Sequence, residues 1–295
     1  MSNYVLATCS TADLDREHLK SRNIEFLGFR YFIDGEEYVD DLGQSLSFNE
    51  FYRRMQSGAE TKTSQPNTQE FKSFMTPFLE SGRDVILLNL SSGLSGAQAS
   101  SNIAVKELME EYPQRKIYVV DSLGASSGMG LLVDKMADLR DSGYTIDELY
   151  QWTEANKKSL HHWFFSTDLT FFVKGGRISR AAGWFGTVLK ICPLLNVDKN
   201  GRLIPREKIR GKANVIKQIV KKMEENANRG LEYDGKCYIS HSSCYEDARA
   251  VADLVEEKFK SLNGPVVINS IGTTIGSHTG PGTVALFFFG KERLD

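Results

Sequence analysis

Four short turns in the sequence combine hydroxyl, basic and glycine residues, as ligand-binding loops often do. They are TSQ at 63–65, SSGLSG at 91–96, KGGR at 174–177 and SHTG at 277–280. Hydroxyl and imidazole groups can donate hydrogen bonds to a carboxylate, and a guanidinium adds its charge to such a bond. The four turns are therefore the candidates for an anion-binding site.

The SSGLSG turn follows an apolar run and precedes a helix-like run, which places it where a strand ends and a helix begins. In α/β sheets ligands bind at that edge, and the first N–H groups of the helix can hold an anion. Ser95 and Gln98 also have the spacing of a capping box, so an ordinary helix start explains the same residues. Ala97 stands where a nucleophile elbow needs glycine.

The other three turns also have ordinary explanations. Pro66 restricts Gln65 to an extended conformation, and Asn67 with Glu70 has the spacing of a helix start, which would leave TSQ as a polar loop. KGGR fits an exposed loop, and a single histidine in a turn is usually incidental. His278, however, is bracketed by glycines that allow close backbone approach, and it can donate to a carboxylate.

Composition narrows the function classes. The chain has 295 residues, a net charge of −2 and a pI near 6.3, which argues against a general nucleic-acid or anionic-membrane binder. No apolar run approaches the roughly 20 residues of a membrane span, and MSNYVLATCS lacks the basic and apolar regions of a signal peptide. We therefore expect a cytoplasmic protein without stable membrane insertion.

The four cysteines, Cys9, Cys192, Cys237 and Cys244, show no CxxC spacing, which favours reduced thiols. Cys237 and Cys244 flank His241, and this cluster raises the question of a metal. No second pair of ligands lies nearby in the sequence, and the segment fits a strand and its end. We expect neither a metal nor a cofactor.

Apolar strand-like runs alternate with amphipathic helix-like runs, and this alternation predicts an α/β protein. Residues 24–40 predict a strand, an Asp-Gly turn and a second strand. Residues 145–148 predict a capping box at the last helix of the first half. After this helix the residue pattern changes, and residues 164–173 are rich in phenylalanine, as aromatic strands are. We therefore expect two lobes, 1–160 and 161–295.

Six segments, in order along nearly the whole chain, resemble the DegV family. They are TSQPNTQEF, SSGLSG, VVDSLGASSGMG, FFVKGGRIS, the stretch from PLLNVDKNGRLIP to KIRGK, and SHTGPGTVALFF. The resemblance implies a two-lobe α/β fold: a mainly parallel sheet with flanking helices in the N-terminal lobe, a mixed α/β C-terminal lobe, and a ligand tunnel between them. It also implies one bound long-chain fatty acid. In the type that is the binding subunit of fatty acid kinase, a separate ATP-using kinase makes the acyl phosphate, which implies a role in phospholipid metabolism.

The same resemblance assigns roles to residues of the four turns. Thr63 and Ser95 resemble the hydroxyl donors to the carboxylate, His278 the third member of that group, and Arg177 the basic residue near the head of the ligand. Ala97 departs from the family, where Thr is frequent, and removes one hydroxyl near the head. The expected ligand-binding set, without any catalytic residue, is Thr63, Ser64, Ser95, Gly96, Arg177, His278 and Thr279.

A basic run follows in the C-terminal half: Arg202, Arg206, Lys208, Arg210 and Lys212. Arg210, in KIRGK, matches a family segment implicated in docking the kinase. Alternation at 208, 210 and 212 would make one face of an edge strand positive. A solvated strand face explains the same pattern, but a docking surface for an acidic partner is our preferred hypothesis.

A serine hydrolase or acyl-transfer enzyme is the alternative function, with Ser95 as nucleophile and His278 as base. No sequence feature identifies a carboxylate that would orient the histidine. A hydrolase would turn over p-nitrophenyl acyl esters and lose that activity with Ser95→Ala, whereas a carrier would not turn them over.

Overall fold

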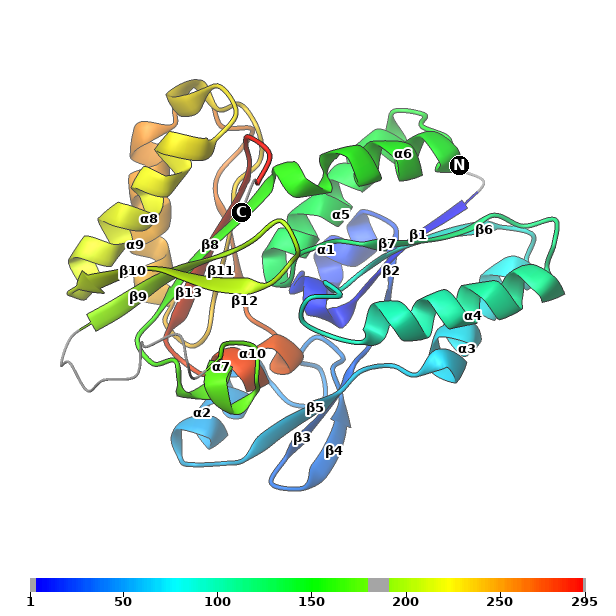
Figure 1. Cartoon of the computed structure of the whole chain (residues 1–295), viewed down its shortest axis with the longest axis horizontal. Helices are drawn as coiled ribbons and strands as arrows, with labels where there is room; N and C mark the ends of the chain where they lie inside the picture. The colour runs from blue at the N-terminus through cyan, green and yellow to red at the C-terminus, as the bar shows by residue number, and fades with distance from the viewer. Residues whose placement is uncertain (1–3, 180–190, 294–295) are drawn as a thin grey trace.

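The computed structural model describes residues 4–179 and 191–293, whose chain forms three β-sheets with helices around them (Figure 1). The first sheet is parallel, with strand order β2-β1-β6-β7, and its central strands β1 and β6 are almost entirely buried because helices cover both faces. Its strands are β1 (Tyr4–Cys9), β2 (Ile24–Leu27), β6 (Asp84–Asn89) and β7 (Ile117–Asp121). The helices of this part are η1 (Ser10–Ala12), α1 (Arg16–Ser21), α3 (Thr68–Glu80), α4 (Ala97–Glu111), α5 (Ser126–Asp141), α6 (Ile146–Asn156) and η2 (Lys157–Ser159).

The second sheet is mixed, with strand order β10-β9-β8-β13-β11-β12. β11 and β12 pair in parallel, and the other neighbours pair antiparallel. Its strands are β8 (Leu160–Ser166), β9 (Ile191–Val197), β10 (Leu203–Arg210), β11 (Tyr238–His241), β12 (Val267–Ser270) and β13 (Thr283–Phe289). α8 (Lys212–Asn226) and α9 (Tyr245–Lys258), with the short η4 (Gly230–Glu232), pack on one side of this sheet. α5 packs against β8, β11 and β13 on the other side, between the two sheets.

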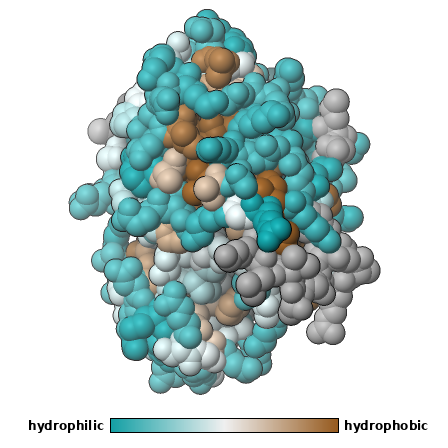
Figure 2. Space-filling model, turned by 90° about the vertical axis from the view of Figure 1, so that its left-hand side faces the viewer, coloured by the Kyte–Doolittle hydropathy of each residue, from teal (hydrophilic) through white to brown (hydrophobic). Residues whose placement is uncertain are grey.

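α8 and α9 each bury one apolar stripe, which includes Val215 and Ile219 on α8 and Val251 and Val255 on α9. Their polar faces point to solvent. Figure 2, which views the molecule from the side where these helices lie in Figure 1, shows a mainly hydrophilic surface with small hydrophobic areas. Among the described residues, no helix is long and apolar enough to span a bilayer.

The third sheet is small and antiparallel, with strand order β4-β3-β5. Asp34 and Gly35 both have positive φ, 53° and 86°, as a two-residue type I′ hairpin requires, so the predicted Asp-Gly turn is confirmed. The strands are β3 (Arg30–Ile33), β4 (Glu36–Val39) and β5 (Thr61–Ser64). The helices α2 (Phe48–Gln56), α7 (Thr170–Lys174) and α10 (Thr273–Thr279) gather around this sheet.

Two predictions about strands are wrong. The first half of residues 24–40 is not one strand, because β2 pairs in the parallel sheet and ends before Gly28, whereas β3 pairs in the third sheet. A Cβ at Gly28 would lie 3.0 Å from the Asp40 carbonyl oxygen. The aromatic stretch at residues 170–174 is the helix α7. There Phe172 is buried and stacks on Phe164 with ring centroids 5.8 Å apart, so tertiary burial overrides the β-propensity of the segment.

Two helices begin with the capping boxes that the sequence predicts. In α3 the Asn67 side chain accepts from the Glu70 N–H while the Glu70 carboxylate accepts from the Asn67 N–H. In α6 Thr145 and Glu148 make the same pair of bonds. These caps satisfy N–H groups that the first turn of a helix leaves without partners.

The start of α4 differs from the prediction. Gly96 occupies the N-cap position without a side-chain bond, so the capping box expected for Ser95 and Gln98 is wrong. The Ser95 Oγ instead accepts from the Ala97 N–H at 3.2 Å. Ser95 is therefore one residue outside the cap, and its hydroxyl proton can serve another acceptor.

The architecture is the predicted α/β arrangement of a parallel sheet with flanking helices followed by a mixed sheet. β8, the first strand of the mixed sheet, starts at Leu160. α10, near the end of the chain, nevertheless packs on β3 and β5 from its first quarter (Figure 1). This return of the chain brings the four turns together.

Candidate functional site

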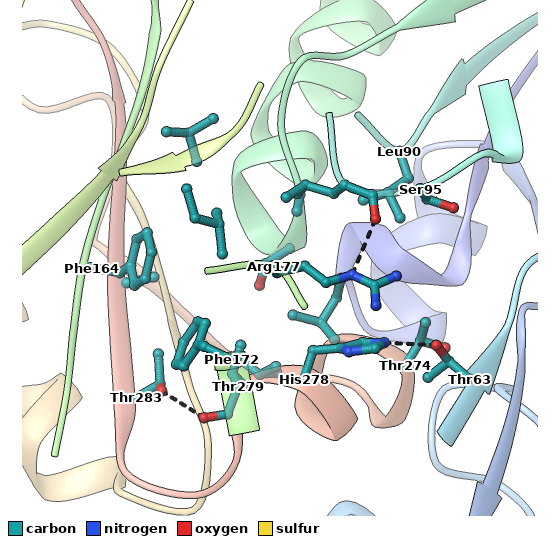
Figure 3. A pocket seen from close by; sticks show the side chains of 18 of the residues that line it. Thr63, Leu90, Ser95, Phe164, Phe172, Arg177, Thr274, His278, Thr279 and Thr283 are labelled. Atoms are coloured by element: carbon teal, nitrogen blue, oxygen red, sulfur yellow. Dashed lines mark hydrogen bonds between the residues drawn. The ribbon is translucent and has the colours of Figure 1, made fainter. Parts of the chain in front are cut away.

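A cavity of about 330 Å³ lies where the three sheets meet (Figure 3). Its volume falls within the roughly 300–1,000 Å³ of small-molecule sites. Apolar side chains from β8, β9, β10, β13 and α7 form much of its wall, and the TSQ, SSGLSG, KGGR and SHTG turns supply polar groups. The cavity is therefore suited to a molecule that is polar at one end and apolar along the rest.

Thr63 and His278 meet at the polar end. β5 presents Thr63, the last turn of α10 presents His278, and the Thr63 Oγ1 to His278 Nε2 distance is 2.7 Å. Burial, with a smaller contribution from the charge of Arg177, lowers the pKa of His278 to about 4. The imidazole is therefore neutral at pH 7.

The other side of the His278 ring explains one glycine of KGGR. His278 Nδ1 is buried and has no hydrogen-bond partner among the described residues. A Cβ at Gly175 would lie 2.4 Å from Nδ1, so the imidazole occupies the space that any larger residue would need. Glycine at this position thus allows the histidine to pack against the KGGR backbone.

Two buried carboxylates hold the start of α10 and thereby the helix that carries His278. The Asp13 Oδ1 accepts from the Gly272 N–H at 2.9 Å. The Asp40 Oδ2 accepts from both the N–H and the hydroxyl of Thr274, at 3.1 and 2.6 Å. Burial raises the pKa of Asp13 and of Asp40, and these hydrogen bonds oppose that shift.

Ser95 lies across the cavity end and is joined to Gln65 of the TSQ turn. The Ser95 hydroxyl donates to Gln65 Oε1 at 3.0 Å, and Gln65 Nε2 donates to the Ser100 hydroxyl at 3.2 Å. Gln65 lines the cavity and was missed as a site residue by the sequence reasoning. The available signal was its place between Ser64 and Pro66, since the proline holds the residue before it extended.

Gly96 does not line the cavity, contrary to the expected binding set. A Cβ there would lie 2.9 Å from Gln65 Oε1, so this glycine makes room for the Gln65 side chain. The other six predicted residues do line it: Thr63, Ser64, Ser95, Arg177, His278 and Thr279.

Arg177 brings a positive charge into the cavity. Figure 3 shows its side chain between Ser95 and His278. Its guanidinium donates from Nε to the Leu94 carbonyl at 3.2 Å and also donates to the Gly175 carbonyl. Burial lowers the pKa of Arg177, and no described carboxylate forms an ion pair with it.

The apolar wall runs away from this polar end along β8 and β13. Thr283 pairs with Ser166 near the polar end, and Phe287 pairs with His162 farther along. The four residue steps from Thr283 to Phe287 correspond to about 13 Å of strand. His162 borders the cavity and packs against α5, where a Cβ at Gly128 would come 2.4 Å from its ring.

The basic run does not form one surface. Arg202 lies before β10, whereas Lys208 and Arg210 are exposed near the far end of this edge strand. Arg206, between them, is half-buried, and its Nε donates to Asn196 Oδ1 at 2.8 Å. Lys212, expected on the strand, instead begins α8, where its ammonium pairs with Asp247 at 2.8 Å.

The described residues do not form the side-chain arrangement of a metal site or of a catalytic triad. Among the described residues no group of three His, Cys, Asp or Glu side chains could hold a metal, and Cys237 lies in the core against α8 and α9. Ser95 and His278 have separate partners, Gln65 and Thr63, and no hydrogen bond joins them. His278 Nδ1, which a carboxylate would have to orient in a triad, lies against Gly175.

Comparisons with known proteins place this geometry in a family. The family model described as "Uncharacterised protein, DegV family" matches residues 5–291. A DegV domain-containing protein of Clostridium perfringens is 37% identical over 293 residues, which are 99% of each chain.

Two solved structures are similar over almost their whole length. The crystal structure of a DegV lipid-binding protein from Thermotoga maritima has a TM-score of 0.84 and 28% identity, and the match covers 100% of both chains. A fatty-acid-binding DegV family protein from Thermus thermophilus has a TM-score of 0.86 and 26% identity, and the match covers 97% of this chain and 99% of the other. The resemblance carried by six short segments is thereby confirmed over the whole fold, and the chain belongs to the DegV family.

Proposed function

We propose that the protein binds one long-chain fatty acid, with the carboxylate at the polar end of the cavity and the acyl chain along β8 and β13. The observation that carries this proposal is the cavity itself, with an apolar wall and the four turns meeting at one end. The lipid binding of the Thermotoga maritima protein and the fatty acid binding of the Thermus thermophilus protein support the same ligand class here.

Thr63, Ser95 and His278 form the proposed carboxylate-binding group. Thr63 and Ser95 are the hydroxyl donors, Ser95 by turning its proton from Gln65 Oε1 to the ligand, and His278 acts through Thr63. Placing the imidazole proton on Nε2, donating to Thr63 Oγ1, avoids burying an unpaired N–H at Nδ1 against Gly175. In that tautomer Thr63 accepts from the histidine, and its own hydroxyl proton points to a ligand. The neutral histidine thus prepares the threonine as a donor.

Arg177 supplies the charge that the carboxylate needs. A carboxylate loses its hydration on entering the cavity, and an unpaired buried charge is very costly. The guanidinium of Arg177 has also lost hydration, and this desolvation lowers its pKa. Bringing the two charges together offsets both costs, which favours an acid over a neutral lipid.

The acyl chain provides most of the binding free energy. Burying a methylene contributes about 0.8 kcal/mol, so a C16 chain gains roughly 10 kcal/mol before ordering costs. The phenyl rings of Phe164 and Phe172 and the side chains of Val197, Leu203 and Phe287 are available as the wall. Hydroxyl donors at the head then add selectivity for the carboxylate.

We further propose that the protein is a non-catalytic carrier that presents the carboxylate to a separate ATP-dependent fatty acid kinase. The exposed ends of Lys208 and Arg210, with Arg206 beside them, form the proposed docking surface for an acidic partner. Reversing the charge with Arg210→Glu should slow acyl-phosphate formation by the cognate kinase and leave lipid binding unchanged. An unchanged rate with this variant would count against the docking role.

Native mass spectrometry of the purified protein, followed by denaturation and lipid analysis, tests the ligand. A one-to-one adduct with the mass of a long-chain fatty acid is expected, and Thr63→Val or His278→Ala should lower its occupancy. An apo mass with no uptake of added oleate or palmitate would overturn the proposal. Turnover of p-nitrophenyl acyl esters that Ser95→Ala abolishes would instead favour the hydrolase.

A further inference from the structure

A second cleft, of about 680 Å³, opens on the other side of the SSGLSG turn. Ser92 and Gly93 of the turn form one wall, and the β9–β10 hairpin tip with Lys199 and Arg202 forms another. Lys158, Glu292 and Arg293 complete it. The fatty-acid site proposed above lies behind the same turn, which contributes Leu94 and Ser95 to that cavity.

The floor of this cleft carries a buried positive charge. Arg293 is 4% exposed, and its guanidinium donates to five backbone carbonyls, those of Leu123, Lys157, Lys158, Val197 and Asp198. No described carboxylate forms an ion pair with it. Burial lowers the pKa of Arg293 to about 10, against the opposing influence of Asp198. The carbonyls satisfy its hydrogen bonds but leave its net charge in place.

The rim adds further cations. Lys199 and Arg202 are exposed, and no described carboxylate lies within ion-pair distance of either. Lys158 has one acidic neighbour, Glu292, at 3.8 Å, and exposed pairs of this length contribute little. The lining therefore has four cations and one carboxylate, Glu292. The nearby carboxylates of Asp198 and Asp121 accept hydrogen bonds from backbone N–H groups of the hairpin tip and of the turns. The excess of cations in the lining favours a ligand with more than one negative charge.

We propose that this cleft binds a phosphate-bearing small molecule of about nucleotide size. Ammonium and guanidinium groups are the usual side-chain partners of phosphate oxygens. The cleft is concave, and its volume lies within the roughly 300–1,000 Å³ of small-molecule sites, which fits a compact anion better than a flat protein surface.

The two sites share one rigid connection. The Ser91 hydroxyl donates to the Gly201 carbonyl at 2.9 Å. A Cβ at Gly93 would lie 2.7 Å from the same carbonyl, so the turn and the hairpin tip are in close contact. An anion that bridges the tip to Lys158 restrains the turn that presents Ser95. Coupling between the two ligands rests on the proposed fatty-acid function, whereas the anion site itself does not.

Calorimetric titration of the full chain with pyrophosphate and with ATP, at physiological ionic strength, tests the site. Saturable one-to-one binding is expected, weakened at least about tenfold by Lys199→Ala and by Arg202→Ala through lost charged hydrogen bonds. Lys221→Ala, on exposed α8, is the matched control and should bind as the parent. Inorganic phosphate as a third probe shows whether one phosphate group is sufficient.

Absence of saturable binding at millimolar pyrophosphate would overturn the proposal, as would equal losses for Lys199→Ala and Lys221→Ala. Fatty-acid affinity is then measured with and without pyrophosphate, and by reciprocity the two ligands should strengthen each other by the same factor. Pyrophosphate binding by a chain that takes up no fatty acid would refute the proposed function and leave the anion site standing.

Discussion

Replacing Gly175 with alanine changes the packing of His278 without straining the backbone. Gly175 has φ −74° and ψ −10°, which alanine adopts readily. The new Cβ would lie 2.4 Å from His278 Nδ1, so the imidazole must move. Because the 2.7 Å contact between His278 Nε2 and Thr63 Oγ1 depends on the ring position, we expect that bond to break.

The expected magnitude follows from the proposed role of this pair. A hydrogen bond to a charged group contributes about 1.5–3 kcal/mol, which corresponds to roughly tenfold to hundredfold weaker fatty-acid binding. His278→Ala sets the size of the full effect. Combining Gly175→Ala with His278→Ala should weaken binding no further than His278→Ala alone, because the displaced ring is then absent.

Displacement of a fluorescent fatty acid from delipidated protein measures the affinity, and thermal unfolding measures stability. Gly176→Ala is the matched control: no atom lies within 4 Å of its Cβ position, but its φ is +74°. Alanine there costs about 1–2 kcal/mol of stability and should leave the affinity unchanged. Parent-like affinity of Gly175→Ala, or equal losses for both variants, would refute the role given to the His278 packing.

Three further outcomes are expected. Gln65→Met should strengthen fatty-acid binding, by up to about tenfold, in the parent and have no effect in a Ser95→Ala background, because Gln65 Oε1 accepts the hydroxyl proton that Ser95 would otherwise donate to the carboxylate; an equal change in both backgrounds would disprove that link. Burial lowers the pKa of both His161 and His278 to about 4 in the folded protein. A histidine of the unfolded chain has a pKa of about 6.5, so as the pH falls below 6.5 the unfolded chain binds protons before the folded chain does. The stability contribution of the two neutral histidines is therefore fully present above pH 6.5 and is lost below it. Urea unfolding at pH 7 and pH 5 should therefore show a loss of about 2 kcal/mol per histidine, and a flat profile would contradict this. Asn67→Ala should lower the unfolding free energy by about 1 kcal/mol through the lost cap of α3, as measured by the urea midpoint, and an unchanged midpoint would show that this cap is dispensable.

The sequence by itself determined the features that depend on neighbours along the chain. The capping boxes at Asn67 and Thr145 and the Asp-Gly hairpin at 34–35 form as expected, because each uses bonds or backbone angles within four residues. The alternation of strand-like and helix-like runs predicted the α/β class, because the periodicity of apolar residues is also a local property of the chain. The six DegV-like segments identified the family because they occur in order along nearly the whole chain, and the family model matches residues 5–291.

Tertiary structure alone decided which of these features meet. Thr63 and His278 are 215 residues apart and touch because β5 joins the third sheet and α10 packs on it. Strand pairing and helix packing are long-range choices, and no local spacing encodes them. Strand pairing also places Arg202 and Arg210 at opposite ends of the edge strand β10. The bond between Gln65 and Ser95 likewise forms only because the fold brings two distant turns together.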